Sequence, residues 1–216
     1  MAPIGAAFAR AWPDAQLAQL LDDALPADLE RAGGVDAAMQ RRFVALARYA
    51  VDAGAEAVLF SCSAFGRAID AARDAVPVPV MKPNEAMVAA AVAGGGPILL
   101  LATFEPTLDS MRPEFEAEAG RQGRVVDLRV AHVPGALAAL QAGDAERHDA
   151  RIAEAAARHG GGETLVALAQ FSMARAAGRV RAATAGTVLT TPDTAVAELQ
   201  RRWSAHAAGF APRAPR

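Results

Sequence analysis

The chain has 216 residues, of which 53% are hydrophobic and 5% aromatic, and 22 Lys and Arg residues stand against 24 Asp and Glu residues for a net charge of −2. This length and composition predict a soluble globular protein with one large core or two small ones. The basic residues are scattered, which excludes a nucleic-acid-binding surface, and no segment reaches the roughly 18 apolar residues that span a membrane. The single cysteine excludes an internal disulfide and a cysteine zinc cluster and favours the reducing cytoplasm.

The first part of the chain is irregular before a clear alternation begins. Residues 6–21 have a weak helical pattern that is broken at Pro13, and the leucines around residue 20 fit either a short strand or a helix end. An amphipathic helix is predicted over 35–53 and ends at Gly54. Next come a short apolar strand over 57–60, buried on both faces, and a helix to about 75. An extended edge segment over 77–81 is followed by a helix that opens within 82–85, with Pro83 or Asn84 suited to its first positions, and runs to about 93.

The strongest break is the run from Gly94 to Pro97, after which the pattern restarts. Strands are predicted over 98–102, 125–133, 164–169 and 187–189, with helices over 105–121, 145–159, about 173–183 and about 191–206, and a disordered tail from Gly209. Alternating strands and helices favour an α/β fold with parallel sheets. We expect two domains, the first comprising 1–94 with 193–216 and the second 97–192.

Cys62 lies at the point where the strand over 57–60 passes into a helix. Backbone N–H groups and the positive end of the helix dipole at such a junction bind anions and favour a thiolate over a thiol. The position therefore predicts a reactive cysteine. The alternative is that Cys62 serves as a small buried hydrophobic residue.

Small polar residues also follow other predicted strands: Ser63, Thr103, Gln170 with Ser172, and Thr190 with Thr191. In open α/β sheets, ligands bind outside the carboxyl ends of the strands, so these groups are expected to line one crevice suited to a small carboxylate. The alternative is that each Ser or Thr only caps the helix that follows it.

A weak internal repeat relates residues 34–62 to residues 143–170. Each stretch contains a helix, a glycine break, a glutamate and an apolar strand. The paired positions are Arg42 with Arg151, Glu56 with Glu163, and Cys62 with Gln170. A true repeat predicts two similar domains that each offer the group at one strand end.

Four strings in this sequence, LFSCSAFGRAID, PVMKPNEAM, LLATFEPTLDSM and LVALAQFSMA, resemble the aspartate/glutamate/hydantoin racemase family of cofactor-independent isomerases. The resemblance covers most of the chain. It implies two similar Rossmann-like domains with parallel sheets, related by pseudo-twofold symmetry, with the active site in the cleft between them.

The resemblance also implies a chemistry. In the family, one cysteine from each half flanks the α-carbon of the substrate; one thiolate removes the proton, and the other thiol returns it from the opposite face. By position, Cys62 matches the first cysteine and Gln170 falls on the second. The expected substrate-binding residues are Ser63, Ala64, Asn84, Thr103, Gln170, Phe171 and Ser172.

Two departures from the family pattern change the expected reaction. Gln170 cannot exchange a proton at neutral pH, so a two-thiol racemisation cannot run here. A single thiol suits one-sided proton transfer, as in a decarboxylation or another isomerisation through an enolate-like intermediate. Family members that resemble arylmalonate decarboxylase also keep one cysteine, but in the other half. Substitute acids are conceivable at Lys82, Glu85, Asp109 and His132, although surface or capping roles explain them better.

The second departure is that the family's first strand, which precedes the segment resembling residues 3–24, is absent from this sequence. We therefore expect an unpaired sheet edge that lowers stability.

Three functional hypotheses follow. The first is a racemase-family enzyme that acts on a small carboxylate with Cys62 as its acid or base, and the second is a one-cysteine decarboxylase or isomerase on the same scaffold. The third is a carboxylate-binding protein without catalysis.

No sequence feature requires a metal, a nucleotide or a flavin cofactor. The expected partner is the small-molecule substrate, without nucleic acid or membrane, and a homo-oligomer is left open. Phe65, Phe104 and Phe171 suggest an apolar ligand side chain, and core packing explains them equally well.

Overall fold

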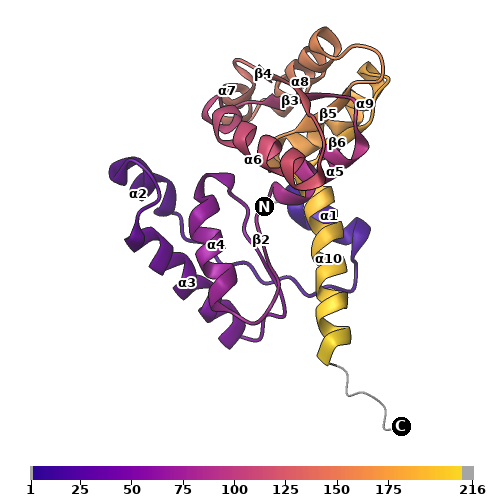
Figure 1. Cartoon of the computed structure of the whole chain (residues 1–216). Coiled ribbons are helices and arrows are strands. Elements are labelled where there is room, and N and C mark those ends of the chain that lie inside the picture. The colour runs from indigo at the N-terminus through magenta and orange to yellow at the C-terminus, as the bar shows by residue number, and fades with distance from the viewer. Residues whose placement is uncertain (1, 211–216) are drawn as a thin grey trace, which may run out of the picture. The chain divides into compact units, whose positions relative to one another are not determined.

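The computed structural model describes residues 2–210 (Figure 1). Its contacts divide the chain into a larger unit, residues 2–11 with 84–196, and a smaller unit, residues 12–83 with 197–210. This division falls before α5 (Glu85–Gly94) and not at the predicted break over 94–97. The reason is that α5 packs against α6 (Pro106–Gln122) of the larger unit. The second division lies within α10 (Thr191–Phe210).

The larger unit is built on a parallel sheet of β3 (Pro97–Ala102), β4 (Asp127–His132), β5 (Leu165–Leu168) and β6 (Val188–Thr190). The strands lie in the order β4-β3-β5-β6. All four predicted strands of the second half are confirmed, with ends within two residues of the expected ones. Parallel strands require helical crossovers, which explains why a helix follows each strand.

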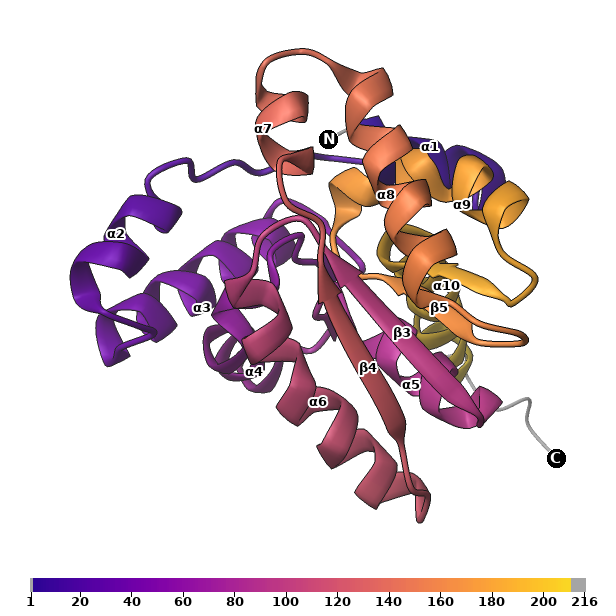
Figure 2. The same cartoon turned by 90° about the horizontal axis from the view of Figure 1, so that it is seen from above.

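The sheet is covered on both faces. Alternate residues of β3 point to opposite sides: Ile98, Leu100 and Ala102 join the core with α5 and α6, whereas Leu99 and Leu101 join the core with α8 (Ala145–His159) and α9 (Ala177–Ala183). Figure 2 shows α6 and α8 beside the sheet formed by β3 and β4. Burial on both faces accounts for the continuous apolar run in the sequence of β3.

Two helical segments of the larger unit differ from the prediction. No helix was predicted between β4 and α8, but the chain forms α7 (Ala136–Gln141) there, a short helix held by the buried Ala136 and Ala139. The helix predicted from about residue 173 begins as a 3-10 helix, η2 (Phe171–Ala176), and becomes α-helical only at α9. Packing of Met173 and Ala176 into the core fixes this tighter turn, and such tertiary contacts leave no clear periodic signal.

The smaller unit contains α2 (Leu25–Ala32), α3 (Ala37–Asp52), α4 (Gly66–Ala75) and a two-stranded parallel sheet of β1 (Val58–Leu59) and β2 (Val80–Met81). The predicted helix over 35–53 is confirmed as α3, whose first turn is capped by the Asp36 carboxylate accepting from the Met39 N–H at 2.7 Å. The core lies between α3 and α4 and one face of the sheet.

Two other expectations for the first part of the chain are wrong. The strand over 57–60 is shorter than predicted and only half-buried, because among the described residues β2 is its only paired neighbour. The weak helical pattern over 6–21 is confirmed only up to its predicted break, because α1 (Ala2–Ala11) ends before Pro13. The leucines around residue 20 form neither a strand nor a helix end: Leu17, Leu20 and Leu21 lie exposed outside any helix or strand. Pro13 explains the end of α1, because proline disrupts a helix interior.

The tail predicted to be disordered from Gly209 falls partly outside the described residues. Residues 209–210 belong to α10, and residues 211–216 are not described.

Candidate active site

Cys62 lies between β1 and a 3-10 helix, η1 (Ser63–Phe65), which leads directly into α4. The strand-to-helix position predicted for the thiol is therefore confirmed, with an added 3-10 turn. The turn is anchored by Phe65, which is 3% exposed and packs 5.0 Å, centroid to centroid, from Phe43. With Phe65 turned into the core, Cys62 and Ala64 are left exposed and Ser63 half-buried. The alternative of a buried structural cysteine is wrong.

Gln170 occupies the matching place in the larger unit. It follows β5, has an extended backbone with φ −125° and ψ 146°, and precedes the 3-10 helix η2, which leads into α9. Cys62 has φ −125° and ψ 124° before η1 and α4. The two residues paired by the internal repeat thus share one backbone conformation and one kind of following turn, each within its own unit.

Gln170 and Thr103 are joined by two hydrogen bonds. Leu101 of β3 pairs with Leu168 of β5, so the residues two places further on, Thr103 and Gln170, end neighbouring strands side by side. The backbone N–H of Thr103 donates to Gln170 Oε1 at 2.7 Å, and the Thr103 hydroxyl donates to the same oxygen at 2.9 Å. Thr103 is 3% exposed, whereas Gln170 is half-buried, so the amide is the outer partner of this pair.

The other predicted polar residues of the larger unit have different surroundings. Phe171 and Ser172 are half-buried at the start of η2, directly after Gln170. Thr190 and Thr191 use their hydroxyls internally: Thr190 donates to the Asp193 carboxylate at 2.6 Å, and Thr191 to the Leu168 carbonyl at 2.8 Å. Thr190 also accepts from the Asp193 N–H at 3.3 Å, which supports the capping interpretation for this residue. The Thr191 hydroxyl instead ties the start of α10 to β5.

Asn84 directly precedes α5 and is 2% exposed. Its side chain makes no capping hydrogen bond, and its Nδ2 has no hydrogen-bond partner among the described residues. The Thr191 hydroxyl lies 3.7 Å from the sulfur of Met87, in the first turn of α5. Because Thr191 directly follows β6, this contact places the first turn of α5 at the carboxyl edge of the sheet, the edge that also carries Thr103 and Gln170.

The candidate substitute acids are distributed over both units. His132 ends β4, and its Nε2 lies 3.4 Å from the Thr103 carbonyl oxygen. Lys82 forms an ion pair of 2.7 Å with Asp70. Glu85 is half-buried in the first turn of α5, and Asp109 is exposed in the first turn of α6.

The three phenylalanines considered as ligand contacts differ in burial. Phe65 belongs to the core of the smaller unit, as the packing alternative held. Phe104 is 51% exposed beside Thr103, and Phe171 is half-buried beside Gln170.

A cluster of charged residues, partly buried, joins the turn after Gln170 to α8. Asp149, in the second turn of α8, lies 2.8 Å from Nδ1 of the fully buried His148, and Arg175 of η2 donates to both Asp149 carboxylate oxygens at 2.9 and 3.0 Å. No sequence signal links residues 149 and 175, because their contact depends on how α8 packs against η2. The cluster fixes the segment that begins at Gln170.

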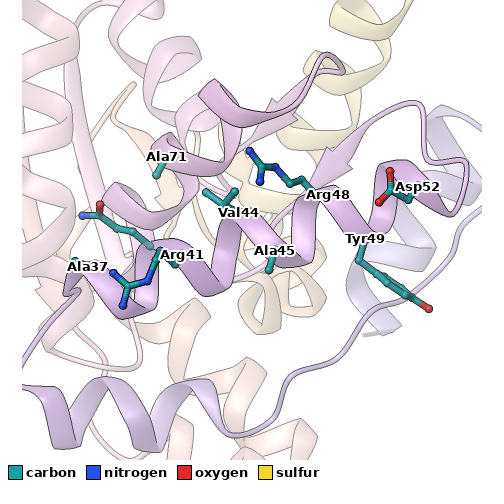
Figure 3. Close-up of a pocket in the computed structure, with 9 residues that line it drawn as sticks. Ala37, Arg41, Val44, Ala45, Arg48, Tyr49, Asp52 and Ala71 are labelled. Carbon is teal, nitrogen blue, oxygen red and sulfur yellow. The ribbon is translucent and has the colours of Figure 1, made fainter.

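A surface depression of the smaller unit lies apart from these residues. It measures about 730 Å³ and is an open hollow along the outer side of α3, lined by Arg41, Val44, Arg48, Tyr49 and Asp52, among others (Figure 3). None of the predicted site residues lines it.

Over residues 2–210, no three His, Cys, Asp or Glu side chains gather closely enough to hold a metal ion. No helix in the same part of the chain combines the length and apolar character needed to cross a membrane.

The sequence model of the Asp/Glu/hydantoin racemase family matches residues 25–199, which is most of the chain. The chain belongs to this family. The predicted resemblance is thereby confirmed, and membership supports a racemase- or isomerase-type enzyme. No curated protein sequence matches the chain significantly.

Solved structures of racemases share the fold of this racemase-family chain. The glutamate racemase isoform RacE1 from Bacillus anthracis superimposes with a TM-score of 0.69 at 13% identity, covering 93% of this chain and 76% of its own. The allantoin racemase from Klebsiella pneumoniae gives a TM-score of 0.63 at 20% identity and covers 96% and 82%. An arylmalonate decarboxylase gives 0.58 at 18% identity and covers 92% and 86%.

Proposed function

We propose that this racemase-family chain is a cofactor-independent enzyme that transfers a proton at the α-carbon of a small carboxylate, with the Cys62 thiol as its acid and base. The observation that carries the proposal is the position of Cys62, exposed at the carboxyl end of a parallel strand and directly before a helical turn. Ligands of α/β sheets bind at this end of the strands. A cytoplasmic location is part of the proposal, because a reducing compartment keeps this thiol free.

The chemistry assigned to Cys62 is a reversible proton transfer. The thiolate takes the α-proton, the electron pair of the C–H bond moves into the carboxylate to give an enolate-like intermediate, and the thiol returns a proton. Hydrogen-bond donors at the carboxylate stabilise the developing charge, and one such donor is typically worth about 3 kcal/mol. Ser63, which follows Cys62 in η1, is one candidate donor.

Deuterium exchange tests this role. Wild type and Cys62→Ser are incubated in D2O with D- and L-aspartate, D- and L-glutamate, hydantoins and substituted malonates, and deuterium at the α-carbon is measured by NMR. We expect exchange with at least one of these compounds and a loss of about 10²- to 10⁴-fold in Cys62→Ser, the usual contribution of a general acid–base group. Ser61→Ala changes an exposed neighbour of the thiol and serves as the control with unchanged exchange.

The outcomes separate the three classes of function. Exchange that survives in Cys62→Ser contradicts the role of the thiol. Binding of a carboxylate that persists in Cys62→Ser, without turnover in either protein, contradicts catalysis and favours a carboxylate-binding protein.

One observation favours a decarboxylase as the second candidate. The residue that matches Cys62 in the other unit is Gln170, and an amide cannot exchange a proton at neutral pH. One thiol can complete a one-sided reaction, in which CO2 leaves the substrate and Cys62 protonates the resulting enolate. The arylmalonate decarboxylase fold supports this candidate as an analogy. Release of CO2 from a substituted malonate indicates the decarboxylase, and an inverted stereocentre without CO2 indicates the racemase.

A further inference from the structure

The orientation of the Gln170 amide is fixed by its partner. A backbone N–H can only donate, so the side-chain atom that lies 2.7 Å from the Thr103 nitrogen must be the oxygen of the amide and not its nitrogen. The Thr103 hydroxyl, at 2.9 Å, donates to the same oxygen. Two donors of Thr103 therefore hold the oxygen of the Gln170 amide. A flipped amide is unfavourable, because it would place the NH2 group of Gln170, which donates, against the Thr103 N–H, which also donates.

This arrangement assigns different roles to two residues that were both expected to bind the substrate. Thr103 was expected to bind the substrate carboxylate, but both of its donors are directed to Gln170, and its side chain is almost fully buried. The two N–H donors on Gln170 Nε2 have no partner among the described residues, and Gln170 is half-buried. The donors available to a ligand at this strand end are thus those of Gln170.

A second, independent observation points to a ligand at the same edge. Asn84 is 2% exposed, and its Nδ2 is buried without a hydrogen-bond partner among the described residues. Buried amide groups in native proteins are ordinarily paired, so an unpaired one calls for an explanation. The Met87–Thr191 contact places the start of α5, and with it Asn84, at the carboxyl edge that carries Gln170.

We propose that the Gln170 Nε2 amide is a fixed hydrogen-bond donor that binds a carboxylate of the ligand, and that Thr103 is a positioning residue that acts only through Gln170. The choice of a carboxylate as ligand group rests on the proposed function. An amide whose oxygen is already engaged offers only donors, so it binds acceptor groups and does not bind an ammonium group. The amine of an amino-acid ligand is therefore not held at this position.

The test compares variants that separate the donors of Gln170 from its acceptor. Gln170→Glu keeps an acceptor for Thr103 but removes both donors. Gln170→Ala removes the amide and frees the N–H and hydroxyl of Thr103, and Thr103→Val removes only the hydroxyl. Gln141→Glu, at an exposed glutamine of α7, adds the same charge elsewhere in the larger unit. Circular dichroism and thermal melting confirm that each variant is folded before binding is compared.

Affinity is measured by calorimetry with phenylmalonate, D- and L-aspartate and D- and L-glutamate. We expect wild type to bind at least one of these carboxylates. Gln170→Glu and Gln170→Ala should each bind that carboxylate at least tenfold more weakly than wild type. Thr103→Val should lose less affinity, and Gln141→Glu should bind as wild type does. In ¹H–¹⁵N spectra, the side-chain NH2 signals of Gln170, identified by their absence in Gln170→Glu, should shift on titration of wild type.

Two results would overturn the proposal while leaving the role of Cys62 intact. The first is unchanged affinity in Gln170→Glu. The second is equal or tighter binding by Gln170→Ala, which would mean that Thr103 binds the carboxylate directly. If wild type neither binds nor exchanges any of the carboxylates, the proposed function fails, and this inference fails with it.

Discussion

Arg175 Nε lies 2.9 and 3.0 Å from the two carboxylate oxygens of Asp149, and this ion pair ties the turn after Gln170 to the second turn of α8. Asp149 is 5% exposed and also contacts the fully buried His148. The pair joins residues 26 positions apart, so it fixes tertiary packing rather than local helix structure.

Removing the acidic partner should destabilise the larger unit. Asp149→Ala leaves the buried His148 and the Arg175 guanidinium without their shared acceptor. Because the Arg175 side chain is 40% exposed and regains water, the expected loss is that of one unsatisfied buried group, about 1–3 kcal/mol. Urea unfolding followed by circular dichroism measures the loss. Glu154→Ala, at an exposed position of the same helix, is the matched control. Equal midpoints for the two variants would contradict a structural role for the pair.

The exposed thiol should react in the folded protein. Cys62 is the only cysteine and is exposed, so one equivalent of a disulfide reagent such as DTNB should react per chain without denaturant. Cys62→Ser should give no reaction. A thiol that reacts only after unfolding would contradict the exposed position, and protection by a carboxylate would support the proposed site.

Stability should depend on pH through Glu198. Hydrogen bonds from Arg201, the larger cause, and from Arg202 lower the pKa of Glu198 to about 2. Partial burial of the carboxyl acts in the opposite direction and raises the pKa. A carboxyl with a lowered pKa in the folded state stabilises the fold above its ordinary pKa, and this contribution disappears as the pH falls toward 2.

Glu198→Gln should therefore melt at a lower temperature than wild type at pH 7, and the difference should shrink as the pH is lowered from about 5 to about 2. Glu116→Gln, at an exposed position of α6, is the control. A difference that stays constant with pH would contradict the ion pair as its cause.

Two glycines should respond to alanine in opposite directions. At Gly186, just before β6, an added Cβ would collide with the backbone carbonyl of Thr164, so Gly186→Ala should lose about 1–3 kcal/mol of unfolding free energy. At Gly178, inside α9, a Cβ meets no atom, and Gly178→Ala should gain about 0.5–1 kcal/mol. Chemical denaturation measures the unfolding free energy of each variant against that of wild type. Destabilisation of equal size at both positions would contradict the close approach at Gly186.

The sequence by itself determined the elements with strong local signals. Apolar runs bounded by glycines predicted the four strands of the larger unit, because strands buried on both faces need continuous apolar sequence. The same signals placed Cys62 and Gln170 at strand ends, and the quoted strings identified the racemase family. The weak helical pattern over 6–21 did not predict the conformation beyond Pro13, where residues 12–24 lie outside any helix or strand.

The tertiary structure alone decided what the polar side chains do at those strand ends. Whether Thr103 offers its donors to a ligand or to Gln170 depends on the register of β3 against β5, and register is set by packing between strands distant in the sequence. The assignment of α5 to the larger unit and the Asp149–Arg175 pair arise in the same way. Local sequence fixes the period and the breaks of a chain, whereas hydrogen bonds between distant residues form only once the core has brought their backbones together.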